Sequence, residues 1–262
     1  MCPPNLLKAS FRLRPTTNPY VGKYAMLLLP TFLIRPGQSS SHTNHTTSPE
    51  PDTLSYMNFI IWNCGGAQSD DFRRNFRSLL DYNRPSLVVL LETHRQSHQT
   101  VKEDFNFNGL IEVSAIGQSG GLLFYGFQMR FMWNKWPLPQ EIHCHIHVLP
   151  FPFTFLFTAI YASTDLATRQ SLWQNIMHVY DHYKSPWLLG GDFNKILHAN
   201  DKFGGLSINN SRANKLLDCL NYSRLTDLGY KGSRYTCTNG RHNSYNILER
   251  IDRITTNYDW LK

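Results

Sequence analysis

The sequence predicts a single α/β domain, because short apolar segments alternate with amphipathic ones from residue 57 to residue 262. Polar residues follow directly after several of the apolar segments, as in α/β sheets whose strand ends open onto a ligand site. A chain of 262 residues is long enough to bury a sizeable core in one such domain.

Residues 1–56 differ in composition from the rest of the chain. They are rich in Pro, Ser and Thr, have no acidic residue before Glu50, and show neither a helical nor a strand period. We expect most of this leader to be disordered, although an acid-poor leader with arginines also fits an organelle transit peptide. The apolar run from Ala25 to Ile34 contains Pro30 and is too short to predict a membrane-spanning helix.

The first half of the domain is expected to contain a strand at 58–62, a helix at 71–82 and a buried strand at 86–91. Phe72, Phe76 and Leu79 recur on one face of this helix. Pro85 favours a break between the helix and the next strand. Segments 120–127 and 130–133 predict a pair of strands.

The second half repeats the alternation with longer elements. The patterns predict strands at 143–148, 153–161 and 187–189, helices at 168–183 and 211–222, and a hairpin formed by 234–238 and 247–254 around a turn at 240–243.

Three histidines, His143, His145 and His147, alternate along one predicted strand and therefore share one face. They are conceivable as metal ligands. We interpret them as the exposed face of a half-buried strand.

The charge and the cysteine content limit the classes of protein to which this chain can belong. The formal net charge of +7 suits a polyanionic partner, although a solvated basic surface is the commoner meaning of such a modest excess. The five cysteines form no CxxC pair and are odd in number, which argues against a disulfide framework and favours a reducing compartment.

Five polar residues stand where predicted strands end. Asn63 and Glu92 follow the first two strands, Tyr161 ends a later one, and Asp192 and Asn194 follow Trp187-Leu188-Leu189-Gly190-Gly191. Any one of them is compatible with an ordinary strand-to-turn junction. Together, two carboxylates, two amides and a phenol at one sheet edge suggest a site for a hard cation and a phosphate.

The ordered motifs resemble the endonuclease/exonuclease/phosphatase superfamily. They are Ile61-Trp62-Asn63, Leu90-Leu91-Glu92-Thr93, Ile160-Tyr161, Gly190-Gly191-Asp192-Phe193-Asn194 and Glu249-Arg250-Ile251-Asp252-Arg253. Within the superfamily, residues 57–262 are most similar to the apurinic/apyrimidinic-like endonuclease domain of non-LTR (LINE-type) retrotransposons. The resemblance implies a DNase I-like four-layer α/β sandwich, with two mixed sheets face to face and helices outside.

The resemblance also implies Mg²⁺-dependent cleavage of a phosphodiester, with Mn²⁺ as a possible substitute. Glu92 would be the main metal ligand, helped by Asn63, and Asp192 would activate the attacking water. Asn194 would hold that water or a phosphate oxygen, and Tyr161 would donate to the phosphate. Asp252 matches the aspartate that supports a catalytic histidine in the family.

The sequence departs from the family pattern in three places. The final Ser-Asp-His motif of the family is missing, so we expect the domain to lack its last strand and Asp252 to lack its histidine. Gly65 stands where many relatives carry a charged residue. Cys237 stands where retrotransposon relatives usually carry a tryptophan.

Three functions are consistent with this resemblance. The first is an endonuclease that nicks DNA, acting in the nucleus as a monomer without membrane contact. The second is a truncated, inactive remnant of the same fold, and the third is another hydrolase of the superfamily, a phosphatase or a ribonuclease. Residues near the predicted hairpin are expected to contact the substrate: Arg234, Tyr235, Cys237, Asn239 and Arg253.

Overall fold

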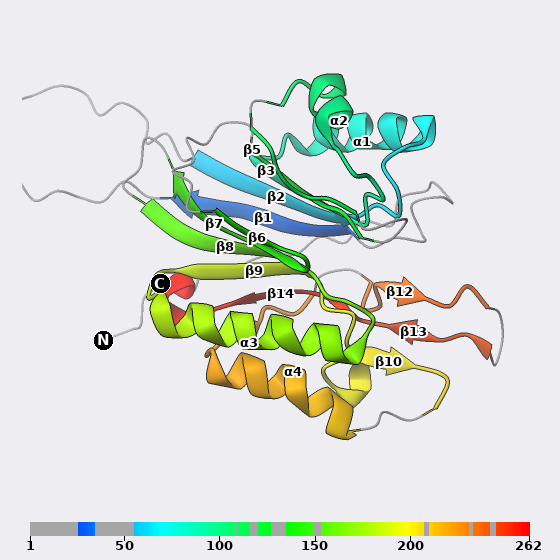
Figure 1. Cartoon of the computed structure of the whole chain (residues 1–262), viewed down its shortest axis with the longest axis vertical. Helices are drawn as coiled ribbons and strands as arrows, with labels where there is room; N and C mark the ends of the chain where they lie inside the picture. Colours follow the sequence, from blue (N-terminus) through cyan, green and yellow to red (C-terminus); the bar gives the residue numbers. More distant parts are fainter. Residues whose placement is uncertain are drawn as a thin grey trace, which may run out of the picture.

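The computed structural model describes residues 26–34, 55–107, 109–115, 120–126, 135–148, 153–206, 210–230, 233–241 and 245–262. Two large sheets face each other, and each is covered on its outer side by helices, which gives four layers (Figure 1). The predicted α/β class with two mixed sheets is therefore confirmed.

The first sheet has the strand order β1-β2-β3-β5-β4. Only the central pair, β2 and β3, is parallel, so both of these strands end at the same edge of the sheet. The strands span Met26–Ile34 (β1), Ser55–Asn63 (β2), Leu87–Leu91 (β3), Ile111–Val113 (β4) and Leu122–Gly126 (β5). Helices α1 (Asp70–Asn83) and α2 (Gln99–Asp104) cover its outer face (Figure 1).

The second large sheet has the order β11-β14-β9-β8-β7-β6, and its parallel pair is β8 with β9. The strands span Lys135–Leu138 (β6), Glu141–Val148 (β7), Phe153–Tyr161 (β8), Trp187–Asp192 (β9), Thr226–Asp227 (β11) and Asp252–Thr256 (β14). Helices α3 (Leu166–His182) and α4 (Asn210–Tyr222) lie on its outer face (Figure 1).

A third, three-stranded sheet extends from one end of the molecule (Figure 1). It contains β10 (Lys202–Phe203), β13 (Leu248–Glu249) and β12 (Cys237–Thr238). The predicted hairpin forms between β12 and β13, but the segment 247–254 is divided between two sheets, because β14 pairs with β9 instead. Segment 130–133, predicted to pair with 120–127, lies outside the described residues.

The side chains of each strand alternate between two cores, as the period of two requires. On β2, Phe59 and Ile61 enter the core between the sheets, whereas Ile60 and Trp62 face the helices. Trp62 stacks on Phe72 of α1 with ring centroids 5.5 Å apart, so the aromatic face predicted for this helix is its buried face.

Both long helices with a described N-terminus begin at a capping side chain. Ser69 Oγ accepts the Phe72 backbone N–H at 3.1 Å in α1, and Asp165 Oδ2 accepts the Thr168 backbone N–H at 2.7 Å in α3. α1 ends at Arg84, whose left-handed backbone directs its N–H to the Leu80 carbonyl.

Strand β1 lies within the leader for which we expected disorder. It pairs antiparallel with β2 from Met26 opposite Trp62 to Ile34 opposite Ser55, with an irregularity between Leu29 and Phe32 at Pro30. The expectation of disorder is therefore wrong for Met26–Ile34, and the remaining residues before Ser55 lie outside the described residues. β1 lies beside β2, where the family resemblance places the last strand.

The three histidines of β7 share one face, but this face is not wholly exposed. His143 is 2% exposed, and its Nδ1 is 2.8 Å from Thr158 Oγ1. Asn175 of α3 bonds to the neighbouring Glu141, because this helix covers the face at that end of the strand. The prediction of an exposed face is wrong for His143.

Candidate active site at the ends of the central strands

Four of the predicted residues meet at one end of the two facing sheets. Asn63 ends β2 and Glu92 follows β3 in the first sheet, whereas Tyr161 ends β8 and Asp192 ends β9 in the second. The Tyr161 hydroxyl donates to Glu92 Oε1 at 2.9 Å, and Asn63 Nδ2 donates to Asp192 Oδ2 at 3.3 Å. Each hydrogen bond joins one sheet to the other, so the structure brings these side chains into one cluster.

The two glycines before Asp192 allow this close approach. A Cβ atom on Gly190 would lie 2.3 Å from Ile61 Cδ1 of the facing sheet. Gly191 has a φ of 149°, and a Cβ atom there would lie 1.9 Å from the Ile160 carbonyl oxygen. A larger residue at position 190 would push β9 away from Ile61 of the facing strand β2, whereas one at position 191 would push it away from Ile160 of β8 in the same sheet.

Asp192 is 2% exposed and is a weaker acid than an ordinary aspartate. Burial raises the pKa of its carboxyl to about 6, and the nearby charge of Glu92 contributes in the same direction. The Asn194 backbone N–H donates to Asp192 Oδ1 at 2.7 Å and partly opposes this shift. A carboxyl that titrates near neutral pH is suited to accept a proton from water.

Tyr161 is a very weak acid in this position. Burial raises the pKa of its hydroxyl, and the charge and hydrogen bond of Glu92 add to the effect. The phenol therefore remains protonated at neutral pH and is able to act as a donor.

Asn194 lies beside Asp192, but part of its amide is already used within the protein. Its Nδ2 donates to the Ala162 carbonyl at 2.7 Å, and its backbone has a φ of 46°. Arg169 Nη1 donates to the Asn194 carbonyl and to the Ser163 carbonyl, both at 2.9 Å. Arg169 is 7% exposed and fixes the loop that carries Asn194, a role for which its position within a helix gives no sequence signal.

Asp252 lies opposite Asp192 on the neighbouring strand β14. It is 4% exposed, and burial followed by the charge of Asp192 raises its pKa well above the ordinary value. Thr236 Oγ1 accepts its backbone N–H at 3.1 Å. Among the described residues no histidine bonds to Asp252. The charge of Glu92 also raises the pKa of this carboxyl, and the charge of Arg253 lowers it.

The residues predicted to contact substrate occupy different environments. Cys237 is partly buried on β12, where burial and then the charges of Asp252 and Asp192 raise the pKa of its thiol to about 11. Asn239 shapes the β12–β13 hairpin, because Nδ2 donates to the Tyr245 carbonyl and Oδ1 accepts the N–H groups of Arg241 and Ile247. Arg234 and Tyr235 are partly exposed on the segment leading to this hairpin.

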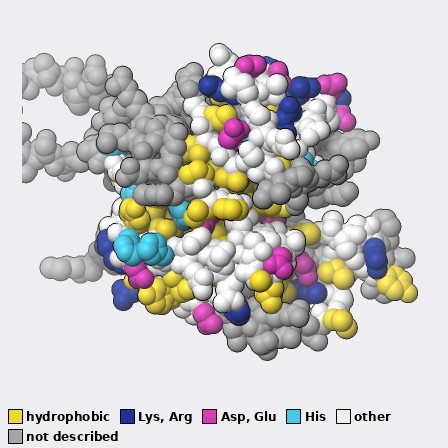
Figure 2. Space-filling model, in the orientation of Figure 1, with side chains coloured by type: hydrophobic (Ala, Val, Ile, Leu, Met, Phe, Trp, Pro, Cys, Tyr) yellow, Lys and Arg dark blue, Asp and Glu magenta, His cyan; other side chains and the backbone are white. Residues whose placement is uncertain are grey.

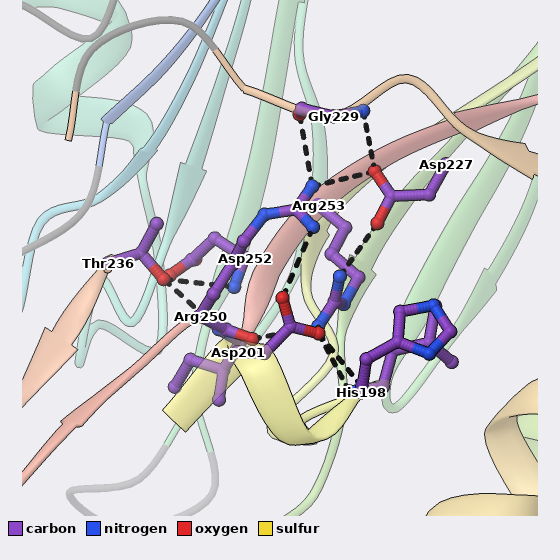
Figure 3. A network of polar contacts seen from close by, with 10 residues as sticks. His198, Asp201, Asp227, Gly229, Thr236, Arg250, Asp252 and Arg253 are labelled. Carbon is purple, nitrogen blue, oxygen red and sulfur yellow. Dashed lines mark hydrogen bonds and ion pairs between the residues drawn. The ribbon is translucent and has the colours of Figure 1, made fainter. Parts of the chain in front are cut away.

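Arg253 does not reach the surface, so its predicted contact with substrate is wrong. Its side chain is fully buried, and its two terminal nitrogens donate at 2.6 Å to Asp227 and Asp201 (Figure 3). Arg250 Nη2 donates to the same Asp227 at 2.6 Å. Because side chains alternate along β14, Arg253 points away from the face that carries Asp252.

Two of the arginines of α1 are also engaged in ion pairs. Arg73 bonds to Asp70 and Asp104, and Arg74 bonds to Asp71. In Figure 2, basic and acidic side chains accordingly interleave over the outer helices of the first sheet. The surface over these helices is therefore not a uniformly basic patch.

The donor set at the strand ends fits a hard divalent cation. Asn63 Oδ1 is buried and has no hydrogen-bond partner among the described residues, and it lies in the cluster that contains the Glu92 carboxylate. No group of three His, Cys, Asp or Glu side chains in the described ranges has the geometry of a complete metal cage. Mg²⁺ is commonly bound by one or two carboxylates, waters and substrate phosphates, so the residues present fit this ion.

This fold and this cluster define a class of α/β sandwich with acidic and amide residues at the facing strand ends. The chain belongs to the Endonuclease/Exonuclease/phosphatase family, whose profile matches residues 60–261. No curated protein sequence matches the chain. Within the described ranges no helix is long and apolar enough to cross a membrane.

Solved structures with the same fold have low sequence identity to this chain. The endonuclease domain of TRAS1, a telomere-specific non-LTR retrotransposon, is 13% identical, with 77% of this chain and 85% of that one covered and a TM-score of 0.52. The AP endonuclease of Leishmania major is 12% identical, with 77% and 79% covered and a TM-score of 0.60. The 3′ phosphatase NExo from Neisseria, bound to a product DNA hairpin, is 16% identical, with 77% and 87% covered and a TM-score of 0.58.

Proposed function

We propose that this chain is a Mg²⁺-dependent phosphodiesterase that nicks DNA. The observation that carries the proposal is the pair of hydrogen bonds joining the sheets, from Tyr161 to Glu92 and from Asn63 to Asp192. They place a carboxylate that titrates near neutrality beside a set of hard oxygen donors. This combination suits the attack of water on a phosphate.

Each side chain has a distinct role in the proposed reaction. Glu92 and Asn63 Oδ1 would hold the cation, which would neutralise charge on the scissile phosphate and its leaving oxygen. Asp192 would accept the proton of the attacking water, and Asn194 would orient that water or a phosphate oxygen. The Tyr161 hydroxyl, which donates to Glu92 in the described structure, would turn to a phosphate oxygen once the Glu92 carboxylate holds the cation, and would donate to it as negative charge develops there.

Several comparisons support DNA as the substrate and a retrotransposon as the origin. One solved relative is the endonuclease domain of a non-LTR retrotransposon, and another is bound to a DNA hairpin. The net charge of +7 favours a polyanionic substrate. We further propose that the protein acts on nuclear DNA as a monomer.

Nicking of supercoiled plasmid by the full chain tests this proposal. Wild-type protein should convert the plasmid to the open-circle form in the presence of Mg²⁺ and not in the presence of a chelator. Asp192→Asn should reduce the rate by about 10²- to 10⁴-fold, the usual contribution of a general base. The exposed Glu103, whose carboxylate accepts a hydrogen bond from Gln99 on the same helix, gives a matched control, and Glu103→Gln should nick at the wild-type rate.

A second candidate is DNA binding without cleavage by the same fold. It is favoured by the environment of Asp252, whose contacts in the described structure include Thr236 and Asp192 but no histidine. Wild-type protein that binds plasmid DNA yet leaves it supercoiled with either Mg²⁺ or Mn²⁺ would support this candidate and contradict the first.

A further inference from the structure

The backbone that carries Glu92 has an uncommon conformation. Glu92 and His94 have φ values of 53° and 54°, in the left-handed region that residues other than glycine seldom adopt. The Glu92 carbonyl accepts the Gly66 N–H at 2.7 Å, and the Thr93 N–H donates to the Gly121 carbonyl at 3.2 Å. Neighbouring segments must therefore hold this turn in place.

A buried chain of hydrogen bonds begins at the residue after Glu92. Thr93 Oγ1 lies 2.6 Å from His98 Nε2, and His98 Nδ1 lies 2.7 Å from Glu112 Oε2. The same carboxylate oxygen accepts the His98 backbone N–H at 3.0 Å. Thr93 and His98 are fully buried, whereas the side chain of Glu112 is 34% exposed.

The direction of these hydrogen bonds follows from the chemistry of the partners. Burial lowers the pKa of His98, so its ring is neutral at neutral pH and has one N–H donor and one acceptor nitrogen. The carboxylate of Glu112 accepts a hydrogen bond from the Nδ1–H of His98. The unprotonated Nε2 then accepts a hydrogen bond from the Thr93 hydroxyl. Thr93 is thus held in one orientation by two residues on other segments.

The opposite side of Thr93 is equally restricted. A Cβ atom on Gly121 would lie 2.2 Å from Thr93 Oγ1, so the absence of a side chain leaves the space that the hydroxyl needs. The preceding residue, Gly120, faces the ring of Tyr161, since a Cβ atom there would lie 3.6 Å from Tyr161 Cε1. One short segment therefore touches both Thr93 and Tyr161, the hydrogen-bond partner of Glu92.

We propose that Thr93, His98 and Glu112 are positioning residues that hold the Glu92 carboxylate in the geometry required for a divalent cation. The arrangement of hydroxyl, imidazole and carboxylate resembles that of a nucleophilic triad, but the full burial of Thr93 keeps its hydroxyl from substrate. This inference rests on the proposed function, in which Glu92 binds the metal.

The affinity of the full chain for Mn²⁺ tests the inference without a measurement of activity. The electron paramagnetic resonance signal of the unbound ion reports how much Mn²⁺ remains free. Loss of a residue that orients a metal ligand costs roughly 10- to 100-fold in metal affinity, so Thr93→Val should weaken binding by at least about 10-fold. Thr93→Ser keeps the hydroxyl and should bind within about 3-fold of wild type. Glu112→Ala should weaken binding, whereas Glu112→Gln keeps a carbonyl acceptor for His98 and should largely retain it.

Two control variants distinguish a failure of the positioning inference from a failure of the proposed metal ligand. Glu103→Ala removes an exposed carboxylate from neighbouring α2 and should leave Mn²⁺ affinity unchanged. Glu92→Gln should remove most of the binding, and its failure to do so would contradict the proposed metal ligand itself.

If Glu92→Gln loses binding while Glu112→Ala and Thr93→Val bind Mn²⁺ as wild type does, the positioning inference alone is overturned. Thermal melts of each variant identify those that fold. Glu112, at the partly exposed end of the chain of hydrogen bonds, provides the decisive variant if Thr93→Val does not fold.

Discussion

Asp192 couples the chemistry of the proposed site to pH. Because burial raises its pKa to about 6, this residue loses its proton only as the pH rises through that value. Nicking measured at saturating DNA and low Mg²⁺ should therefore fall tenfold per pH unit below about pH 6. A rate that stays constant down to about pH 5 would show that Asp192 is not the proton acceptor.

The same raised pKa makes a prediction for stability. A carboxyl whose pKa is higher in the folded state than in the unfolded state binds more protons when folded, so metal-free protein loses stability as the pH rises from the ordinary value toward about 6. A divalent cation offsets this loss by neutralising the carboxylates.

Mg²⁺ should therefore raise the melting temperature more at about pH 7.5 than at about pH 5, where the buried carboxyls are protonated. Differential scanning fluorimetry with and without Mg²⁺ measures this difference. An equal shift at both pH values would argue against binding of the cation beside the buried carboxyls.

Arg253 stabilises the fold instead of contacting substrate. Replacing it with methionine would leave the buried Asp201 without its nearest cation and Asp227 with Arg250 alone, and loss of one partner of a buried ion pair costs about 3–5 kcal/mol. Urea unfolding of Arg253→Met measures this cost. The exposed Arg241 is the matched control, and Arg241→Met should change the free energy of unfolding by less than about 0.5 kcal/mol.

Sequence reasoning located the strand-end residues of the site for a physical reason. Asn63, Glu92, Tyr161 and Asp192 each follow an apolar run, and parallel neighbouring strands end at the same edge of a sheet. Arg253 was misassigned because it was judged by its nearness to the predicted hairpin in sequence, whereas the period of two turns it to the face opposite Asp252. Thr93, His98 and Glu112 carry no periodic signal, since their contact depends on how distant segments pack.

At the scale of elements, long periodic segments were predictable and short ones were not. Strand β8 has the predicted bounds, and α1 and α3 differ from prediction by one or two residues at each end. α2, β4, β10 and β11 have between two and six residues, too few to show a period. β1 was missed because its partner β2 is distant in sequence and Pro30 interrupts its apolar run.

Strand β1 should contribute measurably to stability. A chain that begins at residue 55 exposes the edge of β2 that pairs with Met26–Ile34, whereas a chain that begins at residue 25 keeps this pairing. The shorter chain should melt at a lower temperature and self-associate more in size-exclusion chromatography. Equal melting temperatures and elution volumes for the two chains would show that β1 is dispensable.

At the scale of the whole molecule, the two sheets act as a frame that holds the strand ends together. Relatives that share only 12–16% of their residues with this chain keep the fold over 77% of its length. Packing between the sheets depends on apolar volume and tolerates many substitutions. The proposed reaction instead depends on particular side chains at the strand ends, such as the carboxylates of Glu92 and Asp192.

A double-mutant cycle in plasmid nicking tests most directly whether Glu92 and Asp192 belong to one catalytic unit. Residues that act together are strongly non-additive, so Glu92→Gln, Asp192→Asn and the double variant should all fall to nearly the same residual Mg²⁺-dependent rate. Losses that multiply in the double variant, or a single variant that still nicks at the wild-type rate, would contradict a shared site.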